Sequence, residues 1–155
     1  MRDSEPITDS RPAAPDPRPV VLFDGHCNFC NGTVRWTAER DPFARLRFAP
    51  LRSAAARRTL ARADPPLDFD ALPDAILLVD QAGVHTASTA VLRLMRHLRF
   101  PYPAIAAIAR IVPRPLRDAA YRGFARRRYR WFGRTDECPL PPPGIAVRFL
   151  EEDEG

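Results

Sequence analysis

The chain has 155 residues, of which 45% are hydrophobic, and a formal net charge of +5. This length predicts one domain whose core needs no disulfide staples, and three cysteines are too few for a secreted disulfide scaffold. All 24 basic side chains are arginines, most of which we interpret as a solvated surface.

Neither end of the chain has the apolar composition that a hydrophobic core requires. Residues 1–19 are polar, acidic and proline-rich without the apolar region of a signal peptide, which predicts a disordered leader. Residues 134–155 combine a proline run with an acidic end, which predicts a flexible tail. The longest apolar tract, 102–112, is too short for a membrane span, which needs roughly 20 apolar residues. We therefore expect a structured domain over 20–133 and a cytoplasmic protein without a stable membrane span.

The first half of this domain predicts two strands that alternate with two helices. The unbroken apolar run 20–23 is typical of a buried central strand. A helix should follow over 28–40 and end before Pro42, because the residue before a proline avoids helical geometry. Alternating side chains at 45–48 predict a second strand, and the alanine-rich stretch 54–63 predicts a second helix.

The second half predicts a pair of strands and three further helices. A buried strand is expected at 75–79 and a short one at 84–86, followed by a helix that begins at Ser88. The order β-α-β-α-β-β-α predicts an α/β protein with a thioredoxin-like fold, βαβ followed by ββα. Extra C-terminal helices at 104–111 and 116–130 should cover the domain.

A Cys-x-x-Cys pair, Cys27 and Cys30, stands where the first strand passes into the first helix. The thiolate is the reactive form of cysteine, and a helix N-terminus favours it. We expect Cys27 to be the more exposed cysteine and the nucleophile that attacks a substrate disulfide, and Cys30 to resolve the mixed disulfide. The alternative is a pair of small buried residues or half of a zinc site.

The run Phe23-Asp24-Gly25-His26-Cys27-Asn28-Phe29-Cys30-Asn31 resembles the signature of the DCC-type thiol-disulfide oxidoreductases, which are thioredoxin-like proteins. Asp24, Cys27 and Cys30 match the Asp-x-x-Cys-x-x-Cys motif position by position. The resemblance covers about 20–138 and implies disulfide chemistry. It continues through Phe48-Ala49-Pro50-Leu51, Gly83, Ser88, Ala90, Asp118, Tyr121 and the stretch from Arg128 to Gly133.

Four residues have open roles at this stage. Asp24 could relay a proton or, as we favour, cap the helix with its carboxylate. His26 could favour the neighbouring thiolate or be incidental. Thioredoxin-like proteins place a substrate-binding cis-proline before the third strand. The resemblance implies that position for Pro73, with Pro50 as the weaker alternative. Cys138 could be a third redox cysteine, a free tail thiol or a small docked residue.

Two other classes of function compete with disulfide exchange. A zinc site could recruit Cys138 and a histidine to the Cys-x-x-Cys pair, although no second ligand pair with the usual spacing exists, so we expect no metal. The arginine and aromatic run 126–132 could bind nucleic acid, and 104–112 could lie on an anionic membrane surface. We interpret both stretches as packed helices instead.

The sequence therefore predicts a thiol-disulfide oxidoreductase that uses Cys27 and Cys30 without a bound cofactor. Protein or small-molecule thiols and disulfides are the expected partners, and nucleic acid is not. In a reducing cytoplasm a protein-disulfide reductase is the expected direction.

Overall fold

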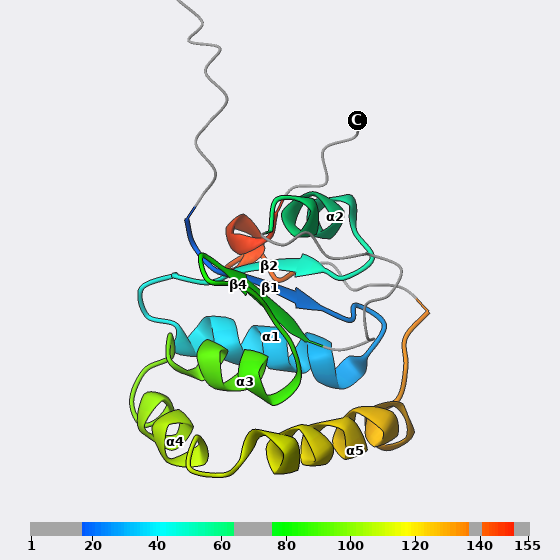
Figure 1. Ribbon diagram of the computed structural model, residues 1–155. Coiled ribbons are helices and arrows are strands. Elements are labelled where there is room, and N and C mark those ends of the chain that lie inside the picture. The colour runs from blue at the N-terminus through cyan, green and yellow to red at the C-terminus, as the bar shows by residue number, and fades with distance from the viewer. Residues whose placement is uncertain (1–16, 64–75, 137–140, 151–155) are drawn as a thin grey trace, which may run out of the picture.

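A four-stranded sheet forms the centre of the computed structural model, which describes residues 17–63, 76–136 and 141–150 (Figure 1). The strand order is β2-β1-β3-β4. β1 and β2 run parallel, while β3 is antiparallel to both β1 and β4. The strands are β1 (Val20–Phe23), β2 (Arg47–Pro50), β3 (Leu77–Asp80) and β4 (Gly83–His85).

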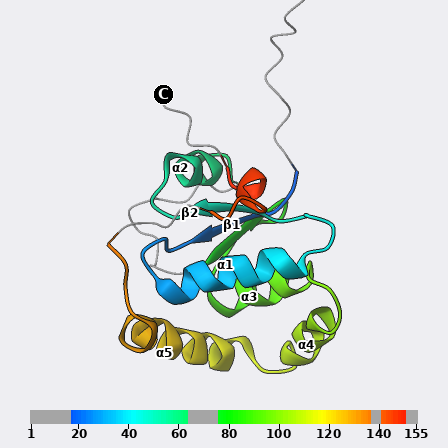
Figure 2. The same cartoon turned by 180° about the vertical axis from the view of Figure 1, so that it is seen from behind.

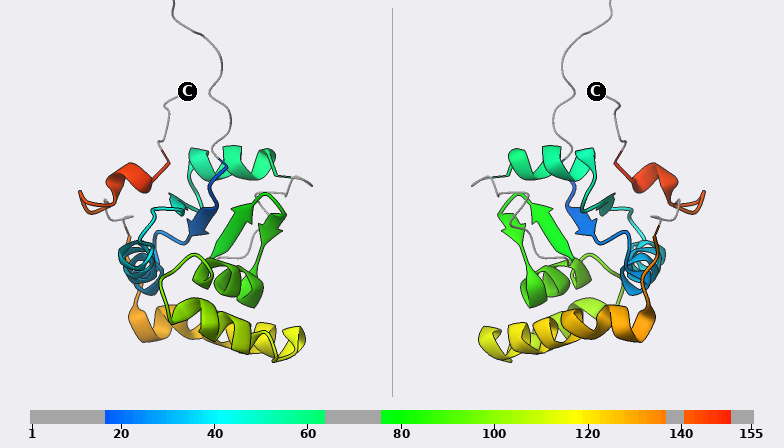
Figure 3. Two further views of the ribbon diagram at one scale, coloured as in Figure 1. Left: turned by 90° about the vertical axis from the view of Figure 1, so that its left-hand side faces the viewer. Right: turned by 90° about the vertical axis from the view of Figure 1, so that its right-hand side faces the viewer.

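Helices lie on both faces of the sheet, as the view from behind also shows (Figure 2). α2 covers one face, and α1 with α3 covers the other (Figure 1). α4 and α5 form a further layer beyond α1 and α3, which the side views separate (Figure 3). The helices are α1 (Asn28–Arg40), α2 (Ala54–Ala61), α3 (Ala87–Met95), α4 (Tyr102–Ala109) and α5 (Arg114–Phe132).

β1 explains why the core has two halves. Successive side chains of a strand point to opposite faces, so Val21 and Phe23 face α1 and α3 whereas Leu22 faces α2. All three are buried, as an apolar run in a central strand predicts. The thioredoxin-like α/β fold expected from the element order is confirmed, with α1 as the crossover between the parallel strands β1 and β2.

The C-terminal segment 141–150 differs from the expectation of a flexible tail. It contains a short 3-10 helix, Ala146–Arg148, and its Phe149 packs against Phe48 of β2, with ring centroids 5.7 Å apart. Arg148 is buried among acceptors at the far end of α1. Sequence reasoning missed this contact because the segment has no periodic apolar pattern of its own.

α4 covers the domain less completely than expected. Ala106 is its only buried residue, whereas Ile105 and Ile108 are exposed. In the described part of the chain, no helix is long and apolar enough to cross a membrane.

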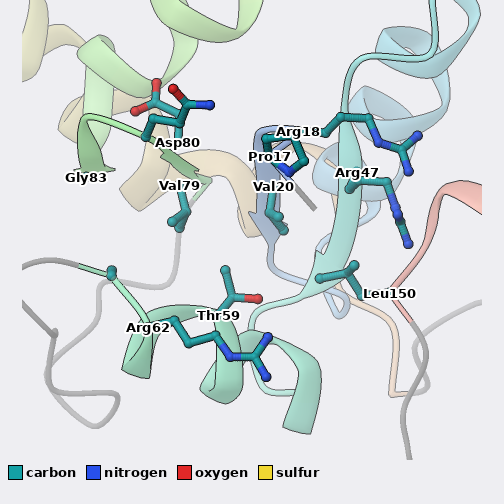
Figure 4. Close-up of a pocket in the computed structure, with 12 residues that line it drawn as sticks. Pro17, Arg18, Val20, Arg47, Thr59, Arg62, Val79, Asp80, Gly83 and Leu150 are labelled. Carbon is teal, nitrogen blue, oxygen red and sulfur yellow. The ribbon is translucent and has the colours of Figure 1, made fainter. Parts of the chain in front are cut away.

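A hollow lies away from the cysteines, between α2 and one end of the strands of the sheet (Figure 4). It measures about 450 Å³ and is lined by the first residue of β1, Val20, by Thr59 of α2 and by the β3–β4 turn. Because Cys27 follows the opposite end of β1, this hollow is not part of the candidate site described next.

Candidate functional site

The Cys-x-x-Cys pair lies where β1 ends and α1 begins. Cys27 is the N-cap residue of α1, and its Sγ accepts a hydrogen bond of 3.3 Å from the backbone amide of Cys30. The sulfur thus occupies the place that an oxygen takes in an ordinary N-cap, facing the positive end of the helix. An amide donor and a helix terminus both stabilise negative charge on that sulfur.

Both cysteines are buried as free thiols, Cys27 with 0% and Cys30 with 2% of its surface exposed. The expectation that Cys27 would be the more exposed of the two cysteines is therefore wrong for this conformation. The reason is tertiary, because residues after α5 return to the start of α1 and lie against Cys27.

Burial raises the pKa of the Cys30 thiol well above its usual range, and the adjacent Cys27 sulfur acts in the same direction. The guanidinium of Arg128 opposes the shift without cancelling it. Cys30 is consequently held as a neutral thiol at neutral pH.

Asp24 is buried beside the pair and does not cap α1 with its side chain, contrary to the favoured interpretation. One carboxylate oxygen accepts the backbone N–H of His26 at 3.0 Å, one residue before the N-cap. The other accepts hydrogen bonds from Arg128 Nη2 at 3.1 Å and from the hydroxyl of Tyr129. Asp24 therefore joins the motif loop to the C-terminal end of α5.

Arg128 lies in the stretch that resembles the family, but sequence reasoning assigned it no role in the site. Its side chain is buried, forms an ion pair with Asp24 and donates from Nη1 to the carbonyl of Ala125 at 3.0 Å. Burial by itself would lower the pKa of Arg128, but the hydrogen bond to Asp24 and the charges of Cys30 and Cys27 raise it on balance. A fixed positive charge therefore lies within electrostatic reach of both sulfurs.

A signal for Arg128 was present in the sequence. Tyr121, Phe124, Arg128 and Phe132 recur at intervals of three and four residues, which is the spacing of one helix face. An arginine at an otherwise aromatic position of such a face needs a buried acidic partner. The interpretation of this run as packed aromatics, with the arginines in water or on helix-end carbonyls, fits the exposed Arg126. It does not fit Arg128, which is buried and paired with Asp24.

A short strap, Gly133–Thr135, returns the chain from α5 to the cysteines. Arg134 forms an antiparallel bridge with Cys27, and the amide of Thr135 donates to the carbonyl of His26 at 2.8 Å. Gly133 has φ of 81°, and a Cβ there would approach Asn28 Nδ2 to 3.1 Å. Glycine is thus required where the strap turns back onto α1.

His26 belongs to the contact with the strap. Its Nδ1 is 3.0 Å from the carbonyl oxygen of Thr135, and the residue is partly buried. That His26 favours the thiolate of Cys27 stays a prediction, because the contact described for its side chain is with the strap and not with a sulfur.

Aromatic side chains surround the middle of the motif. The ring of Phe29, between the two cysteines in sequence, lies 4.8 Å from the rings of both Phe124 and Phe132. Trp131 continues the cluster at 6.0 Å from Phe124 and leaves 58% of its surface exposed. The cluster therefore offers an apolar surface beside the site.

Pro73 and Cys138, which the sequence placed near the site, lie outside the described residues. The cis peptide bond found in the described ranges precedes Pro101. Within those ranges, no group of three or more His, Cys, Asp or Glu side chains could hold a metal ion. The zinc alternative gains no support from that part of the chain.

Comparison with known proteins assigns most of the chain to one family. The sequence profile of the family described as DCC1-like thiol-disulfide oxidoreductase matches residues 21–134. The chain is 40% identical to the uncharacterized protein YuxK of Bacillus subtilis over 86% of this chain and 95% of that protein. It is 36% identical to a chloroplastic DCC family protein of Arabidopsis thaliana over 81% of this chain and 71% of the relative. No solved structure matches.

Proposed function

This chain belongs to the DCC1-like thiol-disulfide oxidoreductase family, and we propose that it acts as a protein-disulfide reductase through Cys27 and Cys30. The observation that carries the proposal is the Sγ of Cys27 at the N-cap of α1, accepting the amide of Cys30. That geometry supports Cys27 as the attacking thiolate. The thiol of Cys30, with its raised pKa, supports the resolving role.

The reaction is a two-electron exchange. The thiolate of Cys27 attacks a substrate disulfide, forms a mixed disulfide and releases one substrate thiolate, which takes up a proton. Cys30 then loses its proton and attacks the Cys27 sulfur, releasing the second substrate thiol. The substrate gains two electrons, and the pair becomes a disulfide. Two thiols of the glutathione class then restore the dithiol and are themselves oxidised to a disulfide.

Arg128 and Asp24 are positioning residues in this proposal. The charge of Arg128 attracts a thiolate on either cysteine, and the ion pair with Asp24 holds the guanidinium in place. The Asp24 carboxylate also orients the motif loop through the His26 amide. The catalytic proton relay considered for Asp24 is less well supported, because both of its oxygens already accept hydrogen bonds.

A substrate reaches Cys27 only after a movement, since its surface is fully buried. The strap is the part that we propose moves, because it contacts Cys27 through one bridge and His26 through two hydrogen-bond contacts of Thr135. Trp131 and Phe132, just before the strap, would then contact a substrate polypeptide. This exposed aromatic surface favours a protein substrate over a small disulfide.

The reductase direction and the cytoplasmic compartment are both proposals. The relative in Arabidopsis thaliana is named as chloroplastic, so the compartment differs at least among members of the family. In any reducing compartment the free dithiol, which is the state of the structure, is the competent form of a reductase.

The reduction potential of the pair tests the proposal. The full chain is equilibrated with glutathione buffers of graded ratio, thiols are trapped, and mass spectrometry identifies the oxidised cysteines. We expect one reversible two-electron transition confined to Cys27 and Cys30, at or below the potential of a cellular glutathione pool. A Cys138→Ser variant should behave in the same way.

Two single variants separate the roles of the cysteines. With a disulfide-containing protein as substrate, Cys30→Ser should accumulate a mixed disulfide on Cys27, whereas Cys27→Ser should accumulate none. A pair that never forms a disulfide would contradict the redox assignment. A mixed disulfide found on Cys30 in the Cys27→Ser variant would reverse the assigned roles.

A further inference from the structure

The charges of the chain are distributed very unevenly. From Gln81 to Thr135 the sequence contains twelve arginines and a single acidic residue, Asp118. This stretch forms β4, α3, α4 and α5, so the positive charge is concentrated in the helices farthest from α2 (Figure 3). A surface of this kind attracts anions over distances of about a Debye length, roughly 8 to 10 Å.

Large apolar side chains are exposed in the same region. Ile111 in the turn between α4 and α5 exposes 81% of its surface, and Leu116 in the first turn of α5 is also exposed. Phe100, Ile105, Ile108 and Val112 complete the exposed apolar set around α4. We call these six residues the α4 apolar surface. Monomeric soluble proteins rarely expose so many large apolar residues together without a binding partner.

A small basic hollow adjoins this surface. It measures about 140 Å³ and lies between α3, α4 and α5, lined by Thr89, Leu92 and four arginines. Arg93 is paired with Asp80 at 2.6 Å, and Arg117 donates from Nε to the carbonyl of Val112. Arg96 and Arg110 have no hydrogen-bond or ion-pair partner for their side chains among the described residues. Two unpaired guanidinium groups facing one hollow favour a phosphate group.

The apolar and basic features alternate along the chain. Arg110 directly precedes Ile111, and Leu116 directly precedes Arg117. Residues of the hollow and residues of the α4 apolar surface therefore share one corner of the molecule, at the turn between α4 and α5 (Figure 1).

We propose that this corner binds the surface of a membrane that contains anionic phospholipids. The hollow takes a headgroup phosphate between Arg96 and Arg110, while Ile111 and Leu116 enter the boundary between headgroups and acyl chains. The helices lie on the surface, since no described helix is able to span a bilayer. The sequence interpretation of 104–112 as a simple core-covering helix is thereby revised.

A second copy of the chain fits this corner less well. Self-association through it would bring arginines against arginines, because no carboxylate lies between Gln81 and Arg117 to receive them. Nucleic acid would match the charge, but five of the six residues of the α4 apolar surface are aliphatic and offer no ring for base stacking. An anionic lipid surface satisfies both the charge and the apolar groups.

The test is sedimentation of the full chain with vesicles of phosphatidylcholine alone and with phosphatidylglycerol added. We expect binding only to the anionic vesicles, weakened by added salt. Arg96→Gln/Arg110→Gln should weaken binding about thirtyfold, because each arginine at an anionic surface contributes roughly a factor of five. Ile111→Ser/Leu116→Ser should weaken it about tenfold or more.

Arg35→Gln/Arg62→Gln is the matched control, because it removes the same charge from exposed positions on α1 and at the end of α2, outside α3, α4 and α5. It should retain most of the binding. Equal losses in both arginine pairs would overturn the proposed site, as would equal binding to both kinds of vesicle. Saturable binding of inorganic phosphate without vesicle binding would assign the hollow to a soluble ligand and also overturn it. The same holds for a dimer in solution that Ile111→Ser/Leu116→Ser converts to monomer.

Discussion

A buried aspartate–arginine pair lies at each end of α1, and the two pairs differ in whether every guanidinium nitrogen has an acceptor. After α1, Asp41 pairs with Arg148, whose Nε and Nη1 donate to the carbonyls of Leu46 and Ala38. Before α1, Asp24 pairs with Arg128, whose Nε finds no acceptor among the described residues. The first guanidinium is fully used in packing.

The second guanidinium has one donor, Nε, without an acceptor in the described part of the chain, and its positive charge interacts with the two cysteine sulfurs. We call the Asp41–Arg148 pair after α1 the structural clamp. The Asp24–Arg128 pair before α1 instead acts through its charge on the cysteines. Hydrogen-bond saturation, rather than burial, separates the two, since both arginines are buried to a similar degree.

The largest expected effect is on stability at the clamp. Arg148→Met should lower the free energy of unfolding by about 3 to 5 kcal/mol, because it leaves the Asp41 carboxylate buried and unpaired. Urea unfolding measures this loss. The alkylation rate of Cys27 in the folded protein should stay near that of the wild type, and a large fall would mean that the clamp also tunes the cysteines.

Compared with Arg148→Met, the Arg128→Met variant should have a larger effect on the reactivity of Cys27 and a smaller effect on stability. Removing its charge should slow alkylation of Cys27 at neutral pH by about tenfold or more, as expected for loss of an opposite charge near a thiolate. The stability loss should be smaller than for Arg148→Met, because Asp24 keeps the His26 amide and the Tyr129 hydroxyl. Adding Asp24→Asn should restore stability but not reactivity; recovery of both would make Arg128 purely structural.

The resolving step should depend strongly on pH. Because burial raises the pKa of Cys30, the thiolate fraction should grow about tenfold per pH unit throughout the neutral range. The rate at which Cys30 resolves the mixed disulfide, measured by stopped flow, should therefore rise with pH and show no plateau near neutrality. Arg128→Met should move the profile further toward alkaline pH, since Arg128 lowers the pKa of Cys30 in part. A plateau near pH 7 would contradict the assignment of Cys30.

Loosening the strap should make Cys27, at the N-terminal end of α1, more accessible to reagents. Thr135→Pro removes the N–H that donates to His26, a hydrogen bond worth about 1 kcal/mol, and should speed alkylation of Cys27 about fivefold. Thr135→Ala keeps that N–H and is the matched control. Unchanged rates in the proline variant would show that another segment limits access.

A third pair, Asp80 with Arg93, should show the smallest effect, because about a third of the arginine side chain is exposed. Burial alone would raise the pKa of Asp80, but hydrogen bonds from His85 and Arg93 lower it on balance. Its stabilising contribution is therefore present at neutral pH and lost as pH falls through the lowered value. Asp80→Asn should cost about 1 kcal/mol or less at neutral pH and nothing in strong acid.

Patterns among neighbouring residues were sufficient to predict much of the fold and, within the site, the cysteine pair. The bounds of α1 were predicted correctly, because an Asp-Gly turn before it and Asp41-Pro42 after it act on neighbouring residues. The cysteine pair followed from spacing within one helical turn. Strand ends shifted, as for β3 at Leu77–Asp80, because pairing with β1 decides which residues of an apolar run enter the sheet.

By itself, the sequence determined the element order, the thioredoxin-like class and the position of Cys27 and Cys30, since each depends on residues close together along the chain. Only the tertiary structure decided that both sulfurs are buried, that Arg128 lies beside them, and that Arg148 closes the far end of α1. These features join residues roughly a hundred positions apart. No periodicity encodes such contacts, because they depend on where α5 and the C-terminal segment pack and on which buried charge must find a partner.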